Sequence, residues 1–400
     1  MHKIERLLQT LAPKGVEFRK LGEVCDFQKG KSITKKAVTF GKVPVIQGGR
    51  QPAYYHNEAN RSGETIAISS SGVYAGYVSY WDIPVFLADS FSVSPKQKTL
   101  MPKYLFHYLT TQQDAIHATK SAGGIPHVYS KDLQNFLIPI PPLEIQQEIV
   151  KILDAFTELN TELNTELKAR KKQYEYYQNM LLDFNDINSN HKDAKEKLAQ
   201  KTYPKRLKTL LQTLAPKGVE FRKLGEVLEY DQPNQYCVTS KEFDKSYPTP
   251  VLTAGKTFIL GYTNEKDNIY QASKSSPVII FDDFTTATQW VDFPFKVKSS
   301  AMKILLPKNP TINIRFIFFY MQTIPYNISG EHTRQWISRY SQLEVPIPPL
   351  EIQQEIVKIL DQFSLLTTDL LAGIPAEIEA RKKQYEYYRE KLLTFKPLKA

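Results

Sequence analysis

Apolar side chains recur with a helical period in two long stretches of the chain. In the first stretch, alternating steps of four and three residues separate Ile145, Ile149, Ile152, Phe156, Leu159 and Leu163. In the second stretch, the same steps separate Ile352, Ile356, Ile359, Phe363, Leu366 and Leu370. A period of about 3.5 residues is typical of a coiled-coil stripe, so each stretch predicts a long helix with one apolar face.

The expected length of these helices bears on what covers their apolar faces. A helix of about 40 residues is roughly 60 Å long, which exceeds the size of one small domain. We therefore expect the two helices to pair with each other, although each stripe could instead pack on its own domain. The second helix has a weak point at Pro375, which follows Gly373 and is expected to kink the helix or restart it.

The remaining apolar positions fall in short runs between turn residues. Runs rich in β-branched and aromatic residues, bounded by Gly, Pro, Ser or Asn, predict strands. They lie at residues 43–47, 65–69, 76–81, 91–95, 250–253, 277–281 and 302–307. Helical patterns lie at residues 4–11, 104–111, 207–214 and 314–323. The predicted fold class is α+β, with two mixed α/β domains joined by two long antiparallel helices that form a coiled coil.

Three segments of the chain occur twice without a change. Residues 7–24 return as 210–227, residues 139–154 as 346–361, and residues 169–177 as 380–388. The stretches between them, about 25–138 and 228–345, barely match. A repeat period of about 200 residues indicates duplication of a whole domain rather than a solenoid. The identical parts should perform one task twice, and the diverged parts should perform related but different tasks.

Duplicated halves of one chain usually relate by a pseudo-two-fold axis, which makes the long helices antiparallel and places each domain at the start of its own helix. The expected parts are a first mixed domain (1–143, including 7–24), a first long helix (144–184), a polar linker (185–203), a second mixed domain (204–350, including 210–227) and a second long helix (351–395).

Composition narrows the class of protein. The 400 residues suffice for two to three domains, and the net charge of +10 fits a polyanion such as nucleic acid, although a merely basic soluble protein has the same charge. Cys25 and Cys237 are the only cysteines, so no disulfide framework is expected. With no signal-peptide core and no apolar run of about 18 residues, we expect a cytoplasmic protein with no membrane partner.

Motifs for catalysis are absent from the chain. It contains no GxGxxG, GxxxxGK[ST], HExxH or GxSxG pattern, and none of its seven histidines is paired at metal-ligand spacing. We therefore expect no catalytic residue, no metal site and no cofactor in this chain.

Polar, basic and aromatic residues cluster instead in loops next to the predicted strands. Arg and Lys read guanine or hold phosphate, Gln reads adenine, and hydroxyl groups contact either. A plain surface loop explains any one of these residues, but together, on both domains of a basic chain, they favour DNA. The candidate DNA-binding residues are Arg50, Gln51, Tyr54, Ser70, Ser71, Tyr74, His127, Tyr129, Lys131, Lys256, Thr286, Gln289, His332, Arg334, Gln335, Arg339 and Tyr340.

The basic and aromatic run RKKQYEYY lies near the end of each long helix. It is identical in both copies while the neighbouring domains have diverged, which suggests two copies of one partner protein. A solvated helix face is the alternative. The candidate partner-binding residues are Arg170, Lys171, Lys172, Tyr174, Arg381, Lys382, Lys383 and Tyr385.

These features resemble the DNA-specificity subunit of type I restriction-modification systems of bacteria. GVEFRKLGEV opens each half, PIPPLEIQQEIVKILD closes each mixed domain, and EARKKQYEYYREKLL follows in the second long helix. The resemblance covers essentially the whole chain. It implies that each mixed domain is a target-recognition domain, which reads one half of a bipartite site on double-stranded DNA, and that the helices set the gap between the halves.

The resemblance also implies partners. The repeated segments would dock two modification (methyltransferase) subunits, and motor-nuclease subunits would join the complex. S-adenosylmethionine, ATP and magnesium would belong to those partners, and this chain would be a non-catalytic subunit. The family supplies no residue-level contact motif inside the recognition domains, so the candidate residues there rest on loop chemistry alone.

Two other classes of function stay open on the sequence. A purely structural coiled-coil scaffold would bind no DNA even with its partners present. A self-sufficient methyltransferase or nuclease would bind its own cofactor, against which the missing motifs argue.

Overall fold

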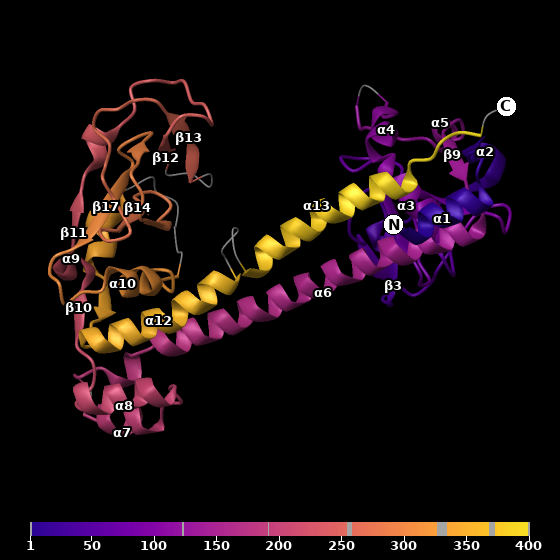
Figure 1. The fold of residues 1–400 in the computed structure, drawn as a ribbon. Helices are drawn as coiled ribbons and strands as arrows, with labels where there is room; N and C mark the ends of the chain where they lie inside the picture. The colour runs from indigo at the N-terminus through magenta and orange to yellow at the C-terminus, as the bar shows by residue number, and fades with distance from the viewer. Residues whose placement is uncertain are drawn as a thin grey trace. The chain divides into compact units, whose positions relative to one another are not determined.

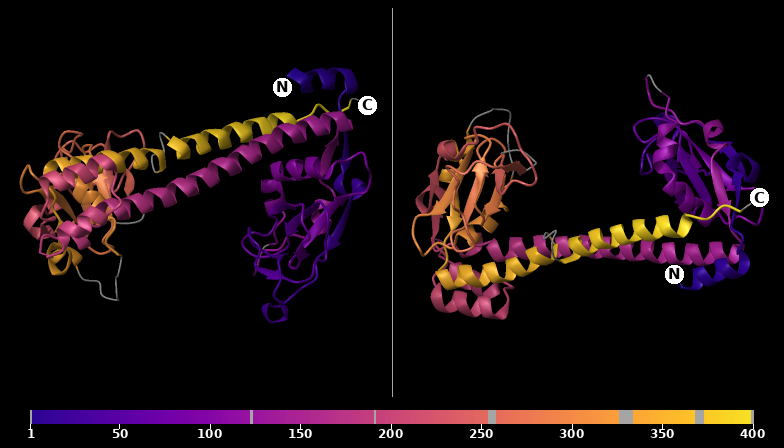
Figure 2. Two further views of the ribbon diagram at one scale, coloured as in Figure 1. Left: turned by 90° about the horizontal axis from the view of Figure 1, so that it is seen from below. Right: turned by 45° about the horizontal axis from the view of Figure 1, so that its top comes forward.

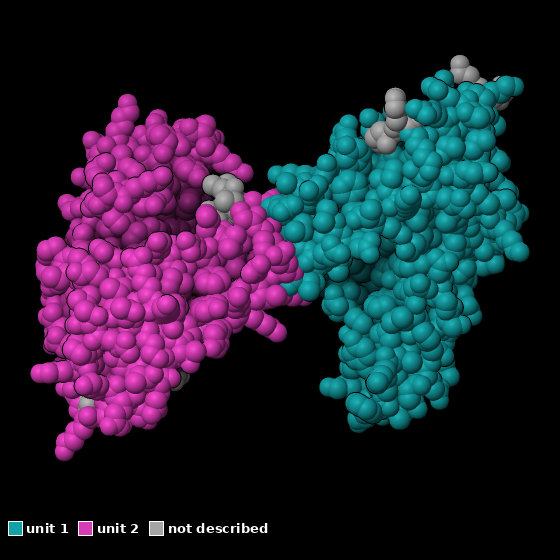
Figure 3. Space-filling view, turned by 60° about the horizontal axis from the view of Figure 1, so that its bottom comes forward, with its two compact units in different colours: residues 1–165, 377–400 teal, residues 166–376 magenta. Residues whose placement is uncertain are grey.

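The structure is a computed structural model that describes residues 2–121, 124–190, 192–253, 258–325, 334–367 and 373–398. The chain forms two compact units, coloured separately in Figure 3. Unit 1 consists of residues 1–165 and 377–400, and unit 2 consists of residues 166–376. The two units contain sheets of the same topology, so each strand of one has a counterpart in the other.

Unit 1 contains three small sheets, with strand orders β2-β8-β5-β6, β4-β3-β7 and β1-β9. The strands are β1 (Glu17–Lys20), β2 (Cys25–Lys29), β3 (Val43–Ile46), β4 (Tyr54–His56), β5 (Thr65–Ser69), β6 (Val78–Trp81), β7 (Phe86–Leu87), β8 (Ser90–Pro95) and β9 (Leu137–Ile140). Only β3 and β7 pair in parallel among these strands. The predicted strands at 43–47, 65–69, 76–81 and 91–95 are confirmed, with boundaries that shift by up to two residues.

Helices and one 3₁₀ turn make up the rest of the regular structure of unit 1 (Figure 1). They are α1 (His2–Leu11), α2 (Leu21–Val24), η1 (Lys35–Ala37), α3 (Pro102–Thr111), α4 (Gln113–Ala118), α5 (Ser130–Leu133), the first part of α6 (Leu143–Leu182) and most of α13 (Gly373–Leu393). Apolar side chains of β5, β8, α3 and α6 form one core, with Ile66, Val93, Tyr104 and Ile149 at its centre. Burial of this apolar surface holds the mixed domain against the start of the long helix.

Unit 2 repeats these sheets, with strand orders β11-β17-β14-β15, β13-β12-β16 and β10-β18. The strands are β10 (Phe221–Lys223), β11 (Leu228–Asp231), β12 (Thr249–Leu252), β13 (Ile259–Thr263), β14 (Val278–Asp282), β15 (Thr288–Val291), β16 (Lys296–Val297), β17 (Met302–Pro307) and β18 (Glu344–Pro346). The helices are η2 (Asn185–Ile187), α7 (Ala194–Gln200), α8 (Lys205–Leu214), α9 (Leu224–Val227), η3 (Pro233–Tyr236), α10 (Ile314–Met321), α11 (Gln335–Ser338), η4 (Tyr340–Gln342), α12 (Leu350–Thr367) and the second part of α6.

The repeated segments pair with each other in both units. β1 runs antiparallel to β9 and places Phe18 opposite Pro139. β10 runs antiparallel to β18 in the same register and places Phe221 opposite Pro346. The identical sequences therefore build one identical structural base under each of the two diverged domains.

Antiparallel pairing of the long helices is present within each unit (Figure 2). In unit 1, the ring of Phe156 on α6 stacks on Tyr388 of α13 at 5.5 Å, and α13 ends at Leu392 and Leu393, which join the core around the start of α6. In unit 2, Tyr177 on α6 stacks on Phe363 of α12 at 5.0 Å. The predicted stripe is thus confirmed, and the YEYY run supplies aromatic rings to it in both copies.

The second long helix differs from the expectation of one helix over 351–395. α12 ends at Thr367 and α13 begins at Gly373, with residues 368–372, which include Leu370, outside the described residues. Gly373 has a φ of +71°, and a Cβ there would lie 2.6 Å from the carbonyl oxygen of Leu365, so a glycine is needed for the restart. Pro375 falls in the first turn of α13, where its missing N–H is harmless. Leu366 leaves the stripe and is 44% exposed.

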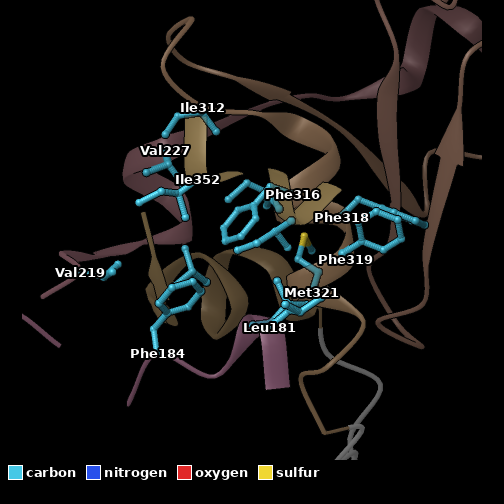
Figure 4. Close-up of a cluster of buried hydrophobic side chains, with 14 of the residues drawn as sticks. Leu181, Phe184, Val219, Val227, Ile312, Phe316, Phe318, Phe319, Met321 and Ile352 are labelled. Carbon is cyan, nitrogen blue, oxygen red and sulfur yellow. The ribbon is translucent and has the colours of Figure 1, made fainter. Parts of the chain in front are cut away.

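The polar segment 185–203, expected to be a linker, is instead folded into unit 2. Ile187, Leu198 and Tyr203 are buried in the core that Figure 4 shows around Phe184 and Phe316. Its backbone pairs with the second repeated segment, since the N–H of Val219 donates to the Ile187 oxygen at 2.8 Å. A few apolar side chains at helical spacing suffice to dock a stretch whose overall composition is polar.

A buried glutamine joins each mixed domain to its long helix. Gln146 Nε2 donates to the carbonyl oxygens of Thr99 and Pro141 at 2.8 and 2.7 Å, and its Oε1 accepts from the N–H of Met101 at 2.9 Å. Gln353 makes the same three bonds in unit 2, to Thr311, Pro348 and Asn313. Both side chains are fully buried, so these bonds form away from water, where leaving a polar group unpaired is costly.

Replacing Gln146 by alanine should destabilise unit 1. The change leaves main-chain groups of Thr99, Met101 and Pro141 without this partner, at a cost of about 1–3 kcal/mol for each group that stays buried and unsatisfied. We expect the free energy of unfolding to fall by at least about 2 kcal/mol, measured by hydrogen exchange of peptides from unit 1. The neighbouring Gln147 is exposed, and Gln147→Ala is the matched control. Equal effects of the two changes would contradict the role of Gln146.

Candidate nucleic-acid interface

Three connecting segments of unit 1 meet at one end of strand β5. The turn after β5 is fastened to the segment around residue 127, because the N–H of Val128 donates to the Ser70 oxygen at 2.9 Å and that of Gly72 to the Pro126 oxygen at 3.0 Å. The β3–β4 loop approaches the same turn, since a Cβ on Gly48 would lie 2.4 Å from the Ser71 oxygen. The end of the sheet thus presents one continuous surface built from three loops.

Cations and aromatic rings lie together on this surface. The guanidinium carbon of Arg50 lies 5.0 Å from the centroid of the Tyr74 ring. The rings of His127 and Tyr129 stack at 6.0 Å, and Lys131 Nζ lies 5.5 Å from the Tyr129 centroid. Arg50, Tyr74, Tyr129 and Lys131 are exposed. Such pairs hold a positive charge in a defined place and leave ring faces on which bases stack.

Most of the unit 1 residues predicted from the sequence are brought together here. They are Arg50, Gln51, Ser70, Ser71, Tyr74, His127, Tyr129 and Lys131. Tyr54 lies apart from them, because it sits on β4 opposite Val45 and packs against the core around Phe86. Sequence reasoning missed Asp89, an exposed carboxylate that accepts a hydrogen bond from the Ser71 hydroxyl.

The corresponding end of unit 2 has the same backbone contact. The N–H of Gln335 donates to the Asp283 oxygen at 2.8 Å, as that of Val128 does to Ser70 in unit 1. Thr286 lies in the β14–β15 turn with a φ of 60°, and its N–H donates to the Asp282 oxygen at 2.9 Å. Gln289 on β15, Arg334 and Arg339 are exposed near this end. Lys256 and His332, also predicted from the sequence, lie outside the described residues.

Two unit 2 residues predicted to contact DNA are buried instead. Tyr340 is 4% exposed, and its ring packs 4.9 Å from that of Phe281 in the core. Gln335 is 9% exposed and begins helix α11. Both side chains help to close the core below their loop, as a polar or aromatic loop residue can. Direct DNA contact by these two residues stays a prediction.

A buried ion pair supports the unit 2 turn from below. Lys303 Nζ lies 3.6 Å from the Asp283 carboxylate and 4.5 Å from the centroid of the Tyr230 ring. Desolvation lowers the pKa of Lys303, and the nearby Asp283 opposes that shift. The other oxygen of Asp283 accepts from the N–H of Trp336 at 2.8 Å. The pair therefore fixes the strand, the turn and helix α11 relative to one another.

The repeated basic and aromatic run divides into a packed face and an exposed face. Tyr174 and Tyr385 are half-buried in their own units, and burial raises the pKa of Tyr174 to about 12 and also raises the pKa of Tyr385. Tyr174 packs against the core of unit 2, and the ring of Tyr385 lies 6.3 Å from that of Phe156 on α6, so both rings are used within their own units. Partner binding by these two tyrosines stays a prediction. The exposed tyrosines of the run, missed by sequence reasoning, are Tyr176 and Tyr387, at 62% and 58%.

The basic side chains of the run are solvent-facing apart from Arg381, which is half-buried. Arg170 and Arg381 each bond a glutamine three residues on, at 3.1 and 3.2 Å, and Lys383 lies 3.8 Å from Glu379. The remaining candidates Lys171, Lys172 and Lys382 are exposed. In unit 2, Lys171 also lines a hollow that Thr286 of the recognition turn shares. Lys171 is therefore placed to reach a ligand that lies against the recognition loops.

Two features are absent from the described part of the chain. No helix within it is long and apolar enough to cross a membrane. Within the same residues, no three His, Cys, Asp or Glu side chains lie close enough together to hold a metal ion.

The chain contains two copies of one fold. The copies have the same sheet topology and the same paired repeated segments, but they carry different side chains in the loops at one end of the sheet. This arrangement is typical of a duplicated recognition subunit. Residues 13–173 and 216–380 match the family described as Type I restriction modification DNA specificity domain, and the chain belongs to this family.

Relatives in several bacteria agree with this assignment. A type I restriction enzyme specificity subunit of Escherichia coli is 54% identical over 188 residues, which is 44% of this chain and 45% of that one. A putative specificity subunit of Haemophilus influenzae is 29% identical over 98% of both chains. The crystal structure of a type I restriction-modification S subunit from M. genitalium has the same fold, with a TM-score of 0.64, 18% identity and coverage of 94% of this chain and 95% of that one.

Proposed function

We propose that this chain reads a bipartite site on double-stranded DNA, with one recognition domain on each half. The observation that carries the proposal is the shared backbone contact at the end of each sheet, Val128 to Ser70 in unit 1 and Gln335 to Asp283 in unit 2. This contact holds equivalent loops at the same end of the sheet in both units, while the side chains on those loops differ. Two domains that recognise different base sequences need the same backbone arrangement with different side chains.

The repeated segments serve as docking surfaces for two modification subunits, and motor-nuclease subunits join that complex. The support is that sequence identity is confined to the base of each unit and to the long helices, away from the recognition loops. The chain itself is non-catalytic. S-adenosylmethionine, ATP and magnesium bind to the partner subunits and supply the methyl transfer and the DNA cleavage there.

Mapping methylated adenines in DNA from cells that make the chain with its modification subunit tests the proposal. We expect one motif with two specified halves and a fixed unspecified gap. A coiled-coil scaffold without DNA reading would give no motif that depends on this chain. Methylation by the purified chain alone would instead identify it as an enzyme.

Removing the exposed tyrosines and lysines of the repeated run should weaken assembly. The variant carries Lys172→Ala, Tyr176→Ser, Lys383→Ala and Tyr387→Ser. Exposed tyrosines are frequent anchors of protein interfaces, at about 2 kcal/mol or more each. We therefore expect the affinity for the modification subunit to fall at least about tenfold at each site, measured by native mass spectrometry.

The matched control replaces two exposed lysines outside the repeated segments, Lys98→Ala and Lys241→Ala, and should assemble normally. A variant with Tyr174→Ser and Tyr385→Ser should lose stability rather than affinity, because these rings are packed within the units. If the variant at Lys172, Tyr176, Lys383 and Tyr387 still bound two copies of the modification subunit with unchanged affinity, these residues would form only a solvent-exposed helix face and no docking surface.

A further inference from the structure

The recognition domain of unit 1 has one arginine available to a ligand. Residues 25–138 contain two arginines, Arg50 and Arg61. Arg61 is committed to its own domain, since its three nitrogens donate to Ser92 Oγ at 2.9 Å and to the main-chain oxygens of Asn60, Gln28 and Lys29 at 2.7, 3.1 and 3.0 Å. Arg50 is exposed, and no carboxylate of the described residues lies within 4.0 Å of its guanidinium.

Two aromatic rings hold Arg50 in place without using its hydrogen-bond donors. Its guanidinium carbon lies 5.0 Å from the centroid of Tyr74 and 5.7 Å from that of Tyr77. Cation–π contact of this kind defines the position of a guanidinium and leaves N–H groups free for a further partner. It also lowers the entropy lost when a ligand is bound, because the side chain is already ordered.

The backbone under these rings is itself closely packed. The N–H of Tyr77 donates to the Tyr74 oxygen at 2.9 Å, which closes the turn. Gly76 adopts a φ of +85°, and a Cβ there would lie 3.0 Å from side-chain atoms of Ile116 and His117. The turn that carries both tyrosines is therefore braced by helix α4 and cannot easily shift.

A planar guanidinium fixed at its base fits the edge of guanine. Guanine offers the O6 and N7 acceptors side by side in the major groove, and arginine meets both at once. A phosphate also accepts a bidentate guanidinium, but it carries no sequence information, whereas Arg50 lies in a segment that differs between the two halves. The position that aligns with Arg50 in the second half of the sequence is Lys256, so the two halves offer different chemistry at this place.

We propose that Arg50 reads a guanine in the half-site of unit 1, with Tyr74 and Tyr77 holding the guanidinium in position. The proposal rests on the proposed function, since it requires that unit 1 contacts DNA bases. Arg50 is then the residue that determines one base pair of the site, and Tyr74 is a positioning residue that acts through it.

The test compares methylated motifs made in cells by the modification subunit with this chain or with Arg50→Ala, Arg50→Lys, Tyr74→Ala or Tyr74→Phe. We expect one G·C pair of one half-site to become unspecified with Arg50→Ala, with discrimination at that pair falling about 10- to 100-fold. Arg50→Lys should restore binding but not discrimination. Tyr74→Phe should retain specificity because it keeps the ring, and Tyr74→Ala should lose part of it at the same base pair.

Lys42→Ala is the matched control, because Lys42 is an exposed cation at the opposite end of the same strand, β3. It removes the same charge and should leave the motif unchanged. A uniform loss of binding to all sequences with Arg50→Ala, together with a smaller salt dependence, would assign Arg50 to a phosphate and overturn the proposal.

The assignment of Arg50 to a guanine and the recognition of a bipartite site would be disproved by different results. An unchanged motif with Arg50→Ala would overturn the assignment of Arg50 and leave the bipartite reading intact. If the unaltered chain supported no bipartite motif, the proposed function would fail and the role of Arg50 would fall with it.

Discussion

A chain in which residues 25–138 are exchanged for the matching segment of another family member is expected to recognise a changed half-site for unit 1 and an unchanged half-site for unit 2. The two mixed domains differ from each other within 25–138 and 228–345, so the recognition side chains that differ lie in these segments. Each base pair of a half-site carries about 1–3 kcal/mol of discrimination. Over three or four base pairs, discrimination between the old and the new half-site should therefore be at least roughly a hundredfold, in favour of the new one.

The glutamine contacts explain why such an exchange should fold. Gln146 bonds only main-chain atoms of the recognition domain, at Thr99 and Met101, and any segment of the same fold supplies those atoms. The measurement is the methylation motif of the reconstituted complex. The reciprocal exchange of 228–345 is the control and should change the other half alone. If the exchanged chain assembled with its partners but recognised neither half-site, the claim that each domain recognises its half-site independently would be refuted.

Four residues inserted into α6 between Thr165 and Glu166 are expected to change the gap between the half-sites. α6 is one continuous helix of 40 residues that contributes to both units, and four residues lengthen it by about 6 Å. Since DNA rises about 3.4 Å per base pair, the preferred gap should shift by one or two base pairs. The half-site sequences should stay the same, because no recognition loop is touched.

The position of the insertion protects the packed rings on both sides. Phe156 pairs with α13 in unit 1, and Tyr177 pairs with α12 in unit 2, and both lie outside the inserted turn. Four residues rotate the helix by only about 40°, whereas a two-residue insertion turns it by about 200° and should prevent assembly. The assay is methylation of a library of split sites with different gaps. An unchanged optimum in a folded four-residue variant would show that the helices do not set the spacing.

The strands and helices were predictable because their signals are local. The run TIAIS over residues 65–69 is largely β-branched and apolar, and it forms β5, one of the two inner strands of the four-stranded sheet of unit 1. The stripe through Ile145 and Ile149 likewise gave a helix whose apolar face is buried. Periodicity identifies the apolar face of a helix or strand that must be buried, and the apolar faces of β5 and of the start of α6 are buried in the core of unit 1.

The same local signals could not say what covers each face. Tyr174 and Tyr176 stand two residues apart in one basic run, yet one ring packs within unit 2 and the other is exposed. Tyr340 sits in a loop-like sequence but closes a core on Phe281, a residue distant along the chain. Which polar or aromatic residue faces solvent depends on tertiary packing, so the candidate site could be located by its loops but not resolved to its side chains.

The discontinuity of unit 1 has a consequence for synthesis on the ribosome. Its core includes Leu392 and Leu393, and the N–H of Val16 donates to the Lys396 oxygen at 2.9 Å, so unit 1 is closed by segments translated after unit 2. Unit 2 is a single stretch of chain and has no such dependence. The recognition domain that emerges first can cover the start of α6 at once, but the face of α6 that packs on α13 at Phe156 stays uncovered until the other half has been made. A chain that stops before α13 therefore leaves the base of its first recognition domain unfinished.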